Sequence, residues 1–285
     1  FVLAALVIAL TIFSGYWGVR VLMGEIYLRN SLVAAAKNDG NGTYNLQIKA
    51  IGLNPNSAEY RQVYSQTNMA LAGAILAKTD LTDTDKEQAS TLIQQAVREG
   101  KAAVALDSKN PIYWSNLATI YRQLVGTVEG AADWSFQAYS QAIALDPTNP
   151  NLKLDFGGLL YAAGMYEDAS RIFEQVVTLK PDLANGWYNL AYAEKKLNKL
   201  GLAVNHLNQA VNLVPVDSGD YEKASKELAD WKEEYEALMK QQADSANATA
   251  AKEAETLKVP EALPTPNVEE QVNIPAEELE PPEVE

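Results

Sequence analysis

Three prolines spaced 34 residues apart constrain the fold of this chain more than any other feature. Pro147, Pro181 and Pro215 each end a similar phrase: QAIALDP, QVVTLKP and QAVNLVP. Two looser copies, KAIGLNP and AAVALDS, end at Pro55 and Ser108. A sequence that repeats at a fixed period of this length builds similar units, each burying its apolar face against its neighbours. We therefore predict an array of stacked units.

Within each unit, small and large apolar residues recur at helical spacing. In the unit that ends at Pro215 they are Trp187, Leu190 and Ala191 on a first helix and Ala203, Leu207 and Ala210 on a second. Small residues let the two helices approach closely, and large ones fill the space to the next unit. The proline ends the second helix, because it lacks a backbone donor and clashes with the preceding turn. Each unit is therefore a helical hairpin.

The hairpins occupy the middle of the chain, and they differ in regularity. Residues 24–110 indicate two divergent hairpins with long helices. Residues 111–217 indicate three regular hairpins, the first with a turn lengthened by the phrase GTVEG. Residues 218–244 predict one capping helix with a single apolar stripe: Tyr221, Ala224, Leu228, Trp231, Tyr235 and Leu238. A solenoid needs such a cap, because its last hairpin would otherwise expose an apolar face.

The two ends of the chain have different compositions. No charged residue occurs before Arg20, and Tyr16 and Trp17 precede it. Nineteen helical residues span about 28 Å, close to the apolar thickness of a bilayer, and aromatic residues favour the headgroup layer. We predict a transmembrane helix over residues 1–22. Residues 245–285 contain many Glu and Pro but few large apolar groups, so we predict a disordered acidic tail there.

The repeats resemble the tetratricopeptide-repeat (TPR) family over roughly residues 24–216. The resemblance implies an all-α, right-handed solenoid whose concave groove, lined by the first helices, holds peptides or partner domains. More narrowly, the phrases YNLQIKAIGLNP, REGKAAVALD and NLATIYR resemble the C-terminal region of bacterial O-antigen ligase-like polytopic membrane proteins. That resemblance implies a bacterial cell-envelope protein, with any catalytic loops upstream of this chain.

The register of the hairpins predicts which residues share the concave surface. The candidate partner-binding residues are Ser115, Thr119, Arg122, Asn151, Leu154, Gly158, Tyr161, Asn185, Tyr188, Tyr192 and Lys195. Tyrosines with scattered polar groups are typical of protein interfaces. The alternative is that the tyrosines pack between hairpins. Arg122 and Lys195 would favour an acidic segment of a protein or peptide partner.

Several classes of function have little support in the sequence. The net charge of −14 provides no basic patch for nucleic acid. With no cysteine and a single histidine, His206, we expect no catalytic residue, no cofactor and no metal site. His206 is expected to be a solvent-facing helix residue. The segment from Asp80 to Glu87 resembles the start of a calcium loop but lacks its glycine, so Asp83 is expected to cap a helix instead.

These observations favour a membrane-anchored scaffold that binds proteins through its groove. One alternative is the non-catalytic C-terminal region of a membrane glycan ligase or polymerase. A second is a pilin-like structural subunit, although Ala5 stands where that family has Glu. The sequence leaves the side of the membrane open, with the extracytoplasmic side favoured.

Overall fold

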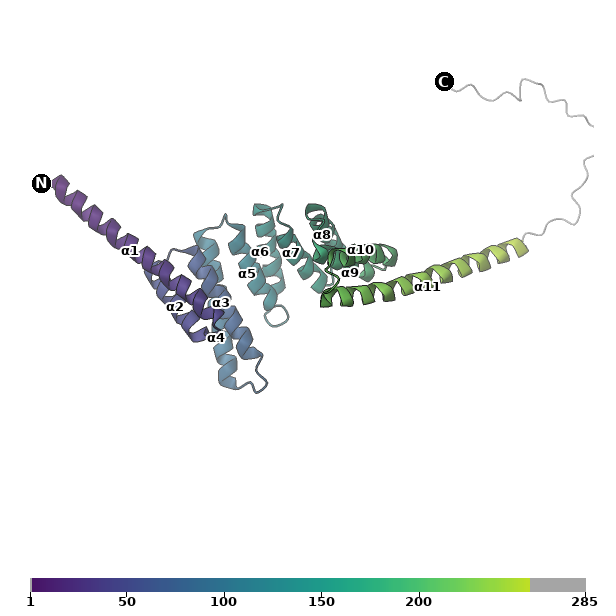
Figure 1. Cartoon of the computed structure of the whole chain (residues 1–285), viewed down its shortest axis with the longest axis horizontal. Helices are drawn as coiled ribbons and strands as arrows, with labels where there is room; N and C mark the ends of the chain where they lie inside the picture. Colours follow the sequence, from purple (N-terminus) through teal and green to yellow (C-terminus); the bar gives the residue numbers. More distant parts are fainter. Residues whose placement is uncertain (1, 257–285) are drawn as a thin grey trace, which may run out of the picture. The chain divides into compact units, whose positions relative to one another are not determined.

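The computed structural model describes residues 2–256, and every regular element in that range is an α-helix. The helices of this range are α1 (Val2–Ala36), α2 (Gly40–Leu53), α3 (Ala58–Leu76), α4 (Asp83–Leu106), α5 (Pro111–Gln123), α6 (Ala131–Leu145), α7 (Pro150–Ala162), α8 (Tyr166–Leu179), α9 (Ala184–Lys196), α10 (Leu200–Leu213) and α11 (Gly219–Thr256). Consecutive pairs from α1–α2 to α9–α10 form hairpins that follow one another (Figure 1). The predicted fold class, an all-α solenoid of helical hairpins, is confirmed.

The chain divides into two compact units, residues 1–232 and residues 233–285. The first unit holds all of the hairpins and the beginning of α11. The second holds the rest of α11 within the described range. The sites discussed below lie in the first unit.

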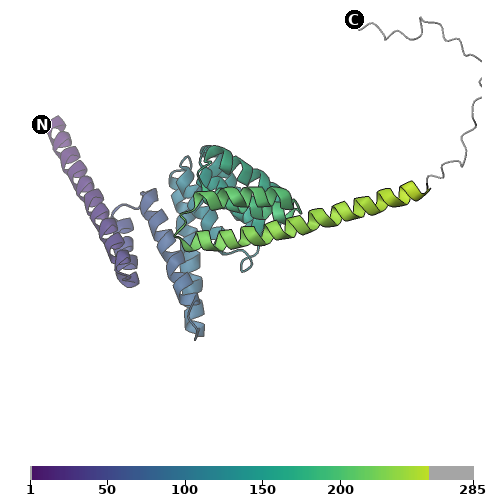
Figure 2. The same ribbon diagram turned by 45° about the vertical axis from the view of Figure 1, so that its right-hand side comes forward.

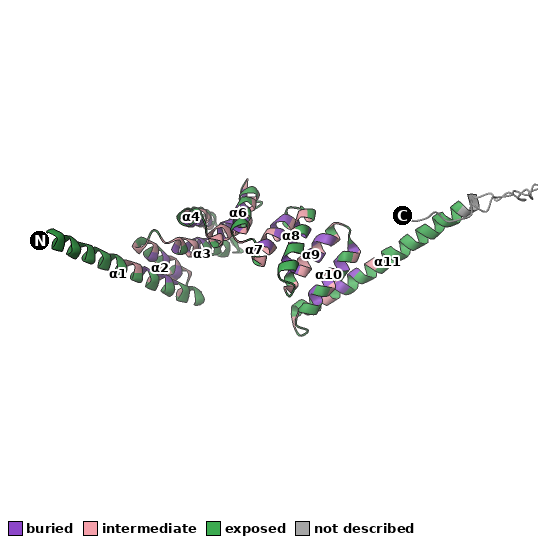
Figure 3. Cartoon of the chain, turned by 90° about the horizontal axis from the view of Figure 1, so that it is seen from above, coloured by how far each residue is buried: buried purple, intermediate pink, exposed green. Residues whose placement is uncertain are grey.

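The core lies between the helices of each hairpin and between successive hairpins, where Figure 3 shows buried residues on the facing sides. One cluster centres on Phe173 of α8, which is 1% exposed and packs with Leu160 of α7 and Leu190 of α9. Gly157 of α7 lets the two helices of this hairpin approach, because a Cβ atom there would lie 2.5 Å from the Phe173 ring. Close packing of this kind is what holds each hairpin to the next.

The turns inside three hairpins share one backbone solution. Asn38, Gly164 and Asn198 each follow the end of a first helix and adopt a left-handed conformation, with φ of 57°, 78° and 58°. The next residue then donates its backbone N–H to a carbonyl five residues back, as Met165 does to Leu160 at 2.9 Å. This is the Schellman ending, which favours glycine or asparagine at that position. The α5–α6 turn is longer and contains Gly126 and Gly130 at positive φ.

Helix α1 is continuous from an exposed apolar segment into the first hairpin. Its residues from 2 to 19 are exposed, whereas Leu28 is buried with Ala50 of α2 and Tyr60 of α3. Its most apolar window has a mean hydropathy of 2.0 and is 0% buried. By length and composition α1 could cross a membrane, and a signal sequence would meet the same criteria.

Helix α11 is longer than the expected capping helix. It continues to Thr256, twelve residues past 244, into the segment for which disorder was expected. The added residues include the alanine-rich stretch ANATAAKEAE. Alanine has the highest intrinsic helix propensity, which favours a helical continuation over this stretch. The part of the predicted acidic tail from residue 257 onward lies outside the described residues.

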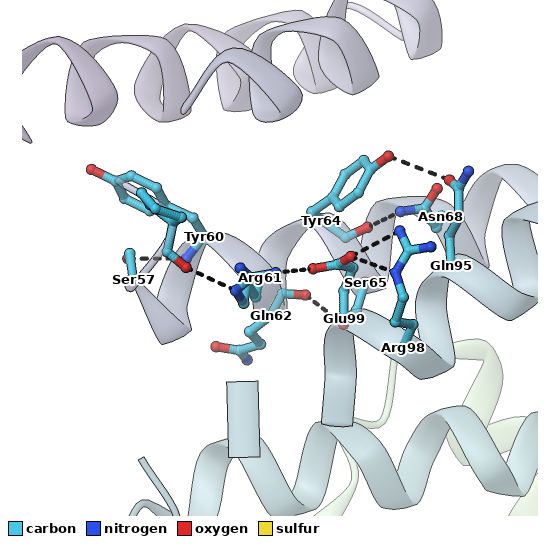
Figure 4. Close-up of polar contacts among 11 residues, drawn as sticks. Ser57, Tyr60, Arg61, Gln62, Tyr64, Ser65, Asn68, Gln95, Arg98 and Glu99 are labelled. Carbon is cyan, nitrogen blue, oxygen red and sulfur yellow. Dashed lines mark hydrogen bonds and ion pairs between the residues drawn. The ribbon is translucent and has the colours of Figure 1, made fainter. Parts of the chain in front are cut away.

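Ionic contacts around the buried Glu99 side chain link the two helices of the second hairpin (Figure 4). The Glu99 side chain of α4 is 8% exposed, and it pairs with Arg61 of α3 at 2.5 Å and with Arg98 at 2.9 Å. One turn earlier, the Gln95 side-chain oxygen accepts a hydrogen bond from the Tyr64 hydroxyl at 3.3 Å. Burial raises the pKa of Tyr64, so its hydroxyl stays protonated as a donor. A buried carboxylate is tolerated here because two guanidinium groups compensate it.

Candidate functional site

Between α3 and α5 lies a hollow of about 330 Å³ that contains two of the predicted groove residues, Ser115 and Thr119. The other residues that line it are Gln62, Gln66, Met69 and Ala70 of α3 and Ile112, Asn116, Ile120 and Gln123 of α5. All of these side chains are uncharged. The hollow therefore offers amide and hydroxyl groups beside small apolar surfaces.

Hydrogen bonds hold the walls of this hollow in place. The buried Asn116 amide donates to the Ser65 hydroxyl of α3 at 2.8 Å, which ties α5 to α3. The Thr119 hydroxyl lies 3.2 Å from the Tyr139 hydroxyl of α6. Burial raises the pKa of Tyr139, so that phenol stays neutral. Contacts within the chain itself therefore hold the walls of the hollow.

An ion pair links α5 to α7 of the next hairpin. Arg122 of α5 lies 3.5 Å from the Asp155 carboxylate of α7, and both side chains are partly exposed. Leu154 and Tyr161 pack against the Phe173 cluster, which matches the alternative that such residues serve packing. Two further predicted residues lie on α7: Gly158, half-buried, and Asn151, exposed. The pairing of Arg122 leaves this part of the groove without the open positive charge expected from the sequence.

At the C-terminal end, the predicted groove residues contact α11. The Tyr188 hydroxyl lies 2.9 Å from the Glu227 carboxylate and 3.1 Å from the Tyr192 hydroxyl. The Tyr192 ring lies 5.1 Å from the Trp231 ring, and the Lys195 ammonium lies 4.4 Å from the centroid of the same tryptophan. Burial first, and then hydrogen bonding to its two partners, raises the pKa of Tyr188. In this structure α11 covers these three residues.

A second hollow lies beside this contact. It has a volume of about 420 Å³ and includes Asn185, the last of the predicted residues, with Tyr188. Lys223 and Asp220 of α11 complete one wall, and α10 contributes Ala210. Of the predicted residues, Ser115 and Thr119 thus line the hollow between α3 and α5, whereas Tyr188, Tyr192 and Lys195 contact α11.

Sequence reasoning did not find the glutamines on α3. Gln62 and Gln66 are one turn apart and face Ser115, yet α3 lacks the tryptophan and proline that marked the register elsewhere. Residues four apart share one face of a helix. That spacing, combined with the small residues of α3, was the available signal.

His206 is not the solvent-facing residue that was expected. Its Nδ1 atom lies 2.7 Å from the Glu194 carboxylate of α9, and the Glu194 side chain is 3% exposed. Its ring also lies 5.4 Å from the Trp187 ring. Glu194 is twelve residues from His206 in the sequence and lies on a different helix, so the residues close to His206 in the sequence do not indicate this contact. The pair gives a buried carboxylate its hydrogen-bond partner.

The calcium-like segment is a helix start. Helix α4 begins at Asp83, and its cap is Thr82 rather than Asp83. The Thr82 hydroxyl accepts from the Asp85 amide, while the Asp85 carboxylate accepts from the Thr82 amide at 3.1 Å. This reciprocal pair is a capping box. Within residues 2–256, no group of three His, Cys, Asp or Glu side chains is arranged to hold a metal ion.

Comparison with known proteins supports the repeat family. The family model for the tetratricopeptide repeat matches residues 128–191, from the end of the α5–α6 turn into α9. No curated protein sequence matches this chain. The match covers part of the hairpin array, and the described residues form a TPR-like solenoid of helical hairpins.

Solved structures share this fold at low sequence identity. MamA aligns with a TM-score of 0.53 at 17% identity, covering 67% of this chain and 91% of its own. The C-terminal part of a TPR repeat-containing protein from Cytophaga hutchinsonii gives 0.59 at 16%, covering 77% and 78%. PilW, a type IV pilus biogenesis factor, gives 0.55 at 15%, covering 78% and 91%. At these identities the likeness concerns the fold alone.

Proposed function

We propose that this chain is a membrane-anchored scaffold that binds a protein or peptide in the groove over α3, α5 and α7. The observation that carries the proposal is the hollow between α3 and α5, where the polar side chains of Gln66 and Gln123 are exposed. Solenoids present such surfaces across several repeats at once. Scaffolding through tetratricopeptide repeats agrees with the family match.

The lining of the hollow indicates the chemistry of the ligand. Gln62, Gln66 and Gln123 carry amides that both donate and accept, and Ile112 and Met69 provide apolar contact. Such a surface suits an extended peptide with exposed backbone groups and short apolar side chains. An acidic segment remains a candidate, although the ion pair between Arg122 and Asp155 reduces the positive charge available to it.

The membrane part of the proposal rests on α1. Residues 2–19 are uncharged, mostly apolar and exposed, with Tyr16 and Trp17 near the end of this segment and Arg20 directly after it, the order expected at a bilayer surface. A lone soluble helix with this composition would leave a large apolar surface in water. Insertion into a bilayer removes that surface from water.

Two narrower readings stay sequence-based predictions. None of the solved structures described above is an O-antigen ligase-like protein, so that resemblance rests on three phrases between residues 44 and 122. A glycan-assembly role and a pilin-like role likewise have no further support. If the gene encodes residues before Phe1, their hydropathy would distinguish these two roles from that of a scaffold with a single membrane anchor.

The groove can be tested by site-specific photo-crosslinking in host membranes. A photoreactive phenylalanine analogue at Gln66 should crosslink a partner, whereas the same analogue at Glu174, exposed on the second helix α8, should not. Ser115→Arg should abolish the crosslink, because its side chain fills the hollow between α3 and α5. Equal crosslinking from both positions, or an unchanged product with Ser115→Arg, would contradict binding in this hollow.

A further inference from the structure

We infer that Arg20 holds the C-terminal end of α2 at the bilayer surface, so that the turn between α2 and α3 contacts the lipid headgroups. The inference rests on the proposed membrane anchorage and adds a specific contact surface to it. The surface consists of residues 54–57, which join the C-terminus of α2 to the N-terminus of α3. Its partner is the headgroup layer of a bilayer.

The contacts of Arg20 carry this inference. Its Nε atom donates to the Leu53 carbonyl at 3.2 Å, and its Nη2 atom donates to the Gly52 carbonyl at 2.8 Å. Both carbonyls belong to the last turn of α2, where backbone oxygens lack partners within the helix. The guanidinium group therefore caps α2 and meets the negative end of its dipole.

The position of this cap along α1 matches the expected membrane boundary. The third guanidinium nitrogen of Arg20 donates to the Tyr16 hydroxyl at 3.1 Å, and the group lies 5.9 Å from the Trp17 ring centroid. Tyrosine and tryptophan favour the headgroup layer. Uncapped carbonyls would be costly wherever they entered the adjoining hydrocarbon region, which contains no water to bind them. Because Arg20 satisfies two of them, α2 can end at the bilayer surface.

Two further features fix the turn at this level. Helix α1 has no break between its exposed segment and the first hairpin (Figure 2), so no flexible linker separates anchor and hairpin. On the other side, the Arg61 Nε atom donates to the Pro55 carbonyl at 3.0 Å, which ties the turn to α3. The opposite end of the hairpin, at Lys37, lies 17 residues beyond Arg20, or about 25 Å along the helix.

The absence of cysteine from the sequence makes a direct test simple. Asn56→Cys and Lys37→Cys, both exposed positions, each provide one site for a fluorescent bimane label in the full chain. The labelled chains are reconstituted in phosphatidylcholine vesicles that contain a lipid with a nitroxide on its headgroup. We expect the label at position 56 to lose fluorescence by quenching and the label at position 37 to keep it. Equal quenching at the two positions overturns the inference.

Vesicle flotation separates this inference from the anchorage on which it rests. Chains that fail to float overturn both proposals together. Chains that float with equal quenching overturn the contact surface and leave the anchorage standing.

Variants of Arg20 test whether this residue holds the end of α2 at the bilayer surface. Arg20→Ala should keep the chain on the vesicles but reduce quenching at position 56, because the end of α2 loses its cap. Arg29→Ala removes the same charge from an exposed position of α1 and should leave the quenching unchanged. Unchanged quenching with Arg20→Ala overturns the role of Arg20. Circular dichroism of each variant shows whether its helices are intact.

Lipid composition distinguishes two roles of Arg20: capping the end of α2, or binding a lipid phosphate group directly. All three guanidinium nitrogens of Arg20 already have partners within the chain. Replacing part of the phosphatidylcholine with phosphatidylglycerol should therefore not change the quenching at position 56. An increase in quenching that depends on the anionic lipid and disappears with Arg20→Ala would show that Arg20 binds headgroups directly, and it would overturn the inferred capping role.

Discussion

Neighbouring glycines on α7 illustrate how single positions control the packing of a hairpin. A methyl group at Gly157 would lie 2.5 Å from the rigid, buried ring of Phe173, whereas one at Gly158 would meet nothing within 4 Å. Both residues are inside the helix, where alanine is intrinsically favoured over glycine by about 0.5–1 kcal/mol. The surroundings therefore decide the sign of each substitution.

We expect Gly157→Ala to lower the free energy of unfolding by about 1–3 kcal/mol, as overpacking in a core does. Gly158→Ala should raise it by about 0.5–1 kcal/mol, because it reduces the conformational freedom of the unfolded chain. Urea titration of both variants measures the two effects. Changes of the same sign at the two positions would contradict the close contact between Gly157 of α7 and Phe173 of α8.

The contact between His206 and Glu194 changes the expected cost of removing the histidine. His206→Ala leaves the buried Glu194 carboxylate without this partner, so unfolding should become easier by about 1–3 kcal/mol. Asn205→Ala, on an exposed neighbouring position, should cost less than about 0.5 kcal/mol. Guanidinium titrations compare the two. Equal small effects would instead support a solvent-facing histidine.

Among the helices, α4 depends on its N-terminal cap in a way that pH can reveal. Hydrogen bonding from Lys78, and then from Thr82, lowers the pKa of Asp85 to about 2. The carboxyl group of an unfolded aspartate titrates near about 3.9. A folded-state pKa below the unfolded value stabilises the protein above the unfolded pKa, and this contribution disappears as pH falls through the folded value.

Asp85→Asn should therefore destabilise the protein at pH 7, and the difference from the wild type should shrink from about pH 4 to about pH 2. Asp83→Asn, two residues away and exposed, should show a smaller difference at neutral pH. Urea midpoints at several pH values measure both variants. A difference for Asp85→Asn that stays constant across this range would contradict the charged role of the cap.

Helix α11 shows that one element can serve both as a cap and as a cover. Its buried residues Ala224, Leu228 and Trp231 close the apolar end of the last hairpin. The same stretch places Glu227 and Trp231 on the tyrosines of α9. The proposed binding surface therefore lies in the hollow between α3 and α5, whose lining includes no residue of α11.

For the chain as a unit, the central prediction concerns membrane attachment. The full chain should sediment with membranes, resist carbonate extraction and be released by detergent. Deleting residues 2–19 should release it, because the remaining part of α1 keeps the residues that pack in the first hairpin, including Leu28. Fractionation of the two forms measures this. Recovery of the full chain in the soluble fraction without detergent would contradict the anchor.

Local signals explain why much of the fold could be predicted. The proline period marks where second helices end, and Pro111 and Pro150 begin first helices at positions that tolerate a missing donor. Asn38, Gly164 and Asn198 mark the turns inside hairpins. Each of these signals acts through the backbone of a few adjacent residues, so it can be read without knowing the packing.

Contacts between distant residues could not be read in this way. Arg20 meets Leu53 across 33 positions, and Tyr188 meets Glu227 across 39. The repeat period identifies the residues that face the groove, but it does not say what lies on them. Side-chain partners depend on how whole helices pack, and that packing is set by many weak contacts acting together. The amino-acid sequence by itself therefore determined the hairpins and their order, whereas the packing of α11 on the last hairpin determined which of the predicted groove residues are covered.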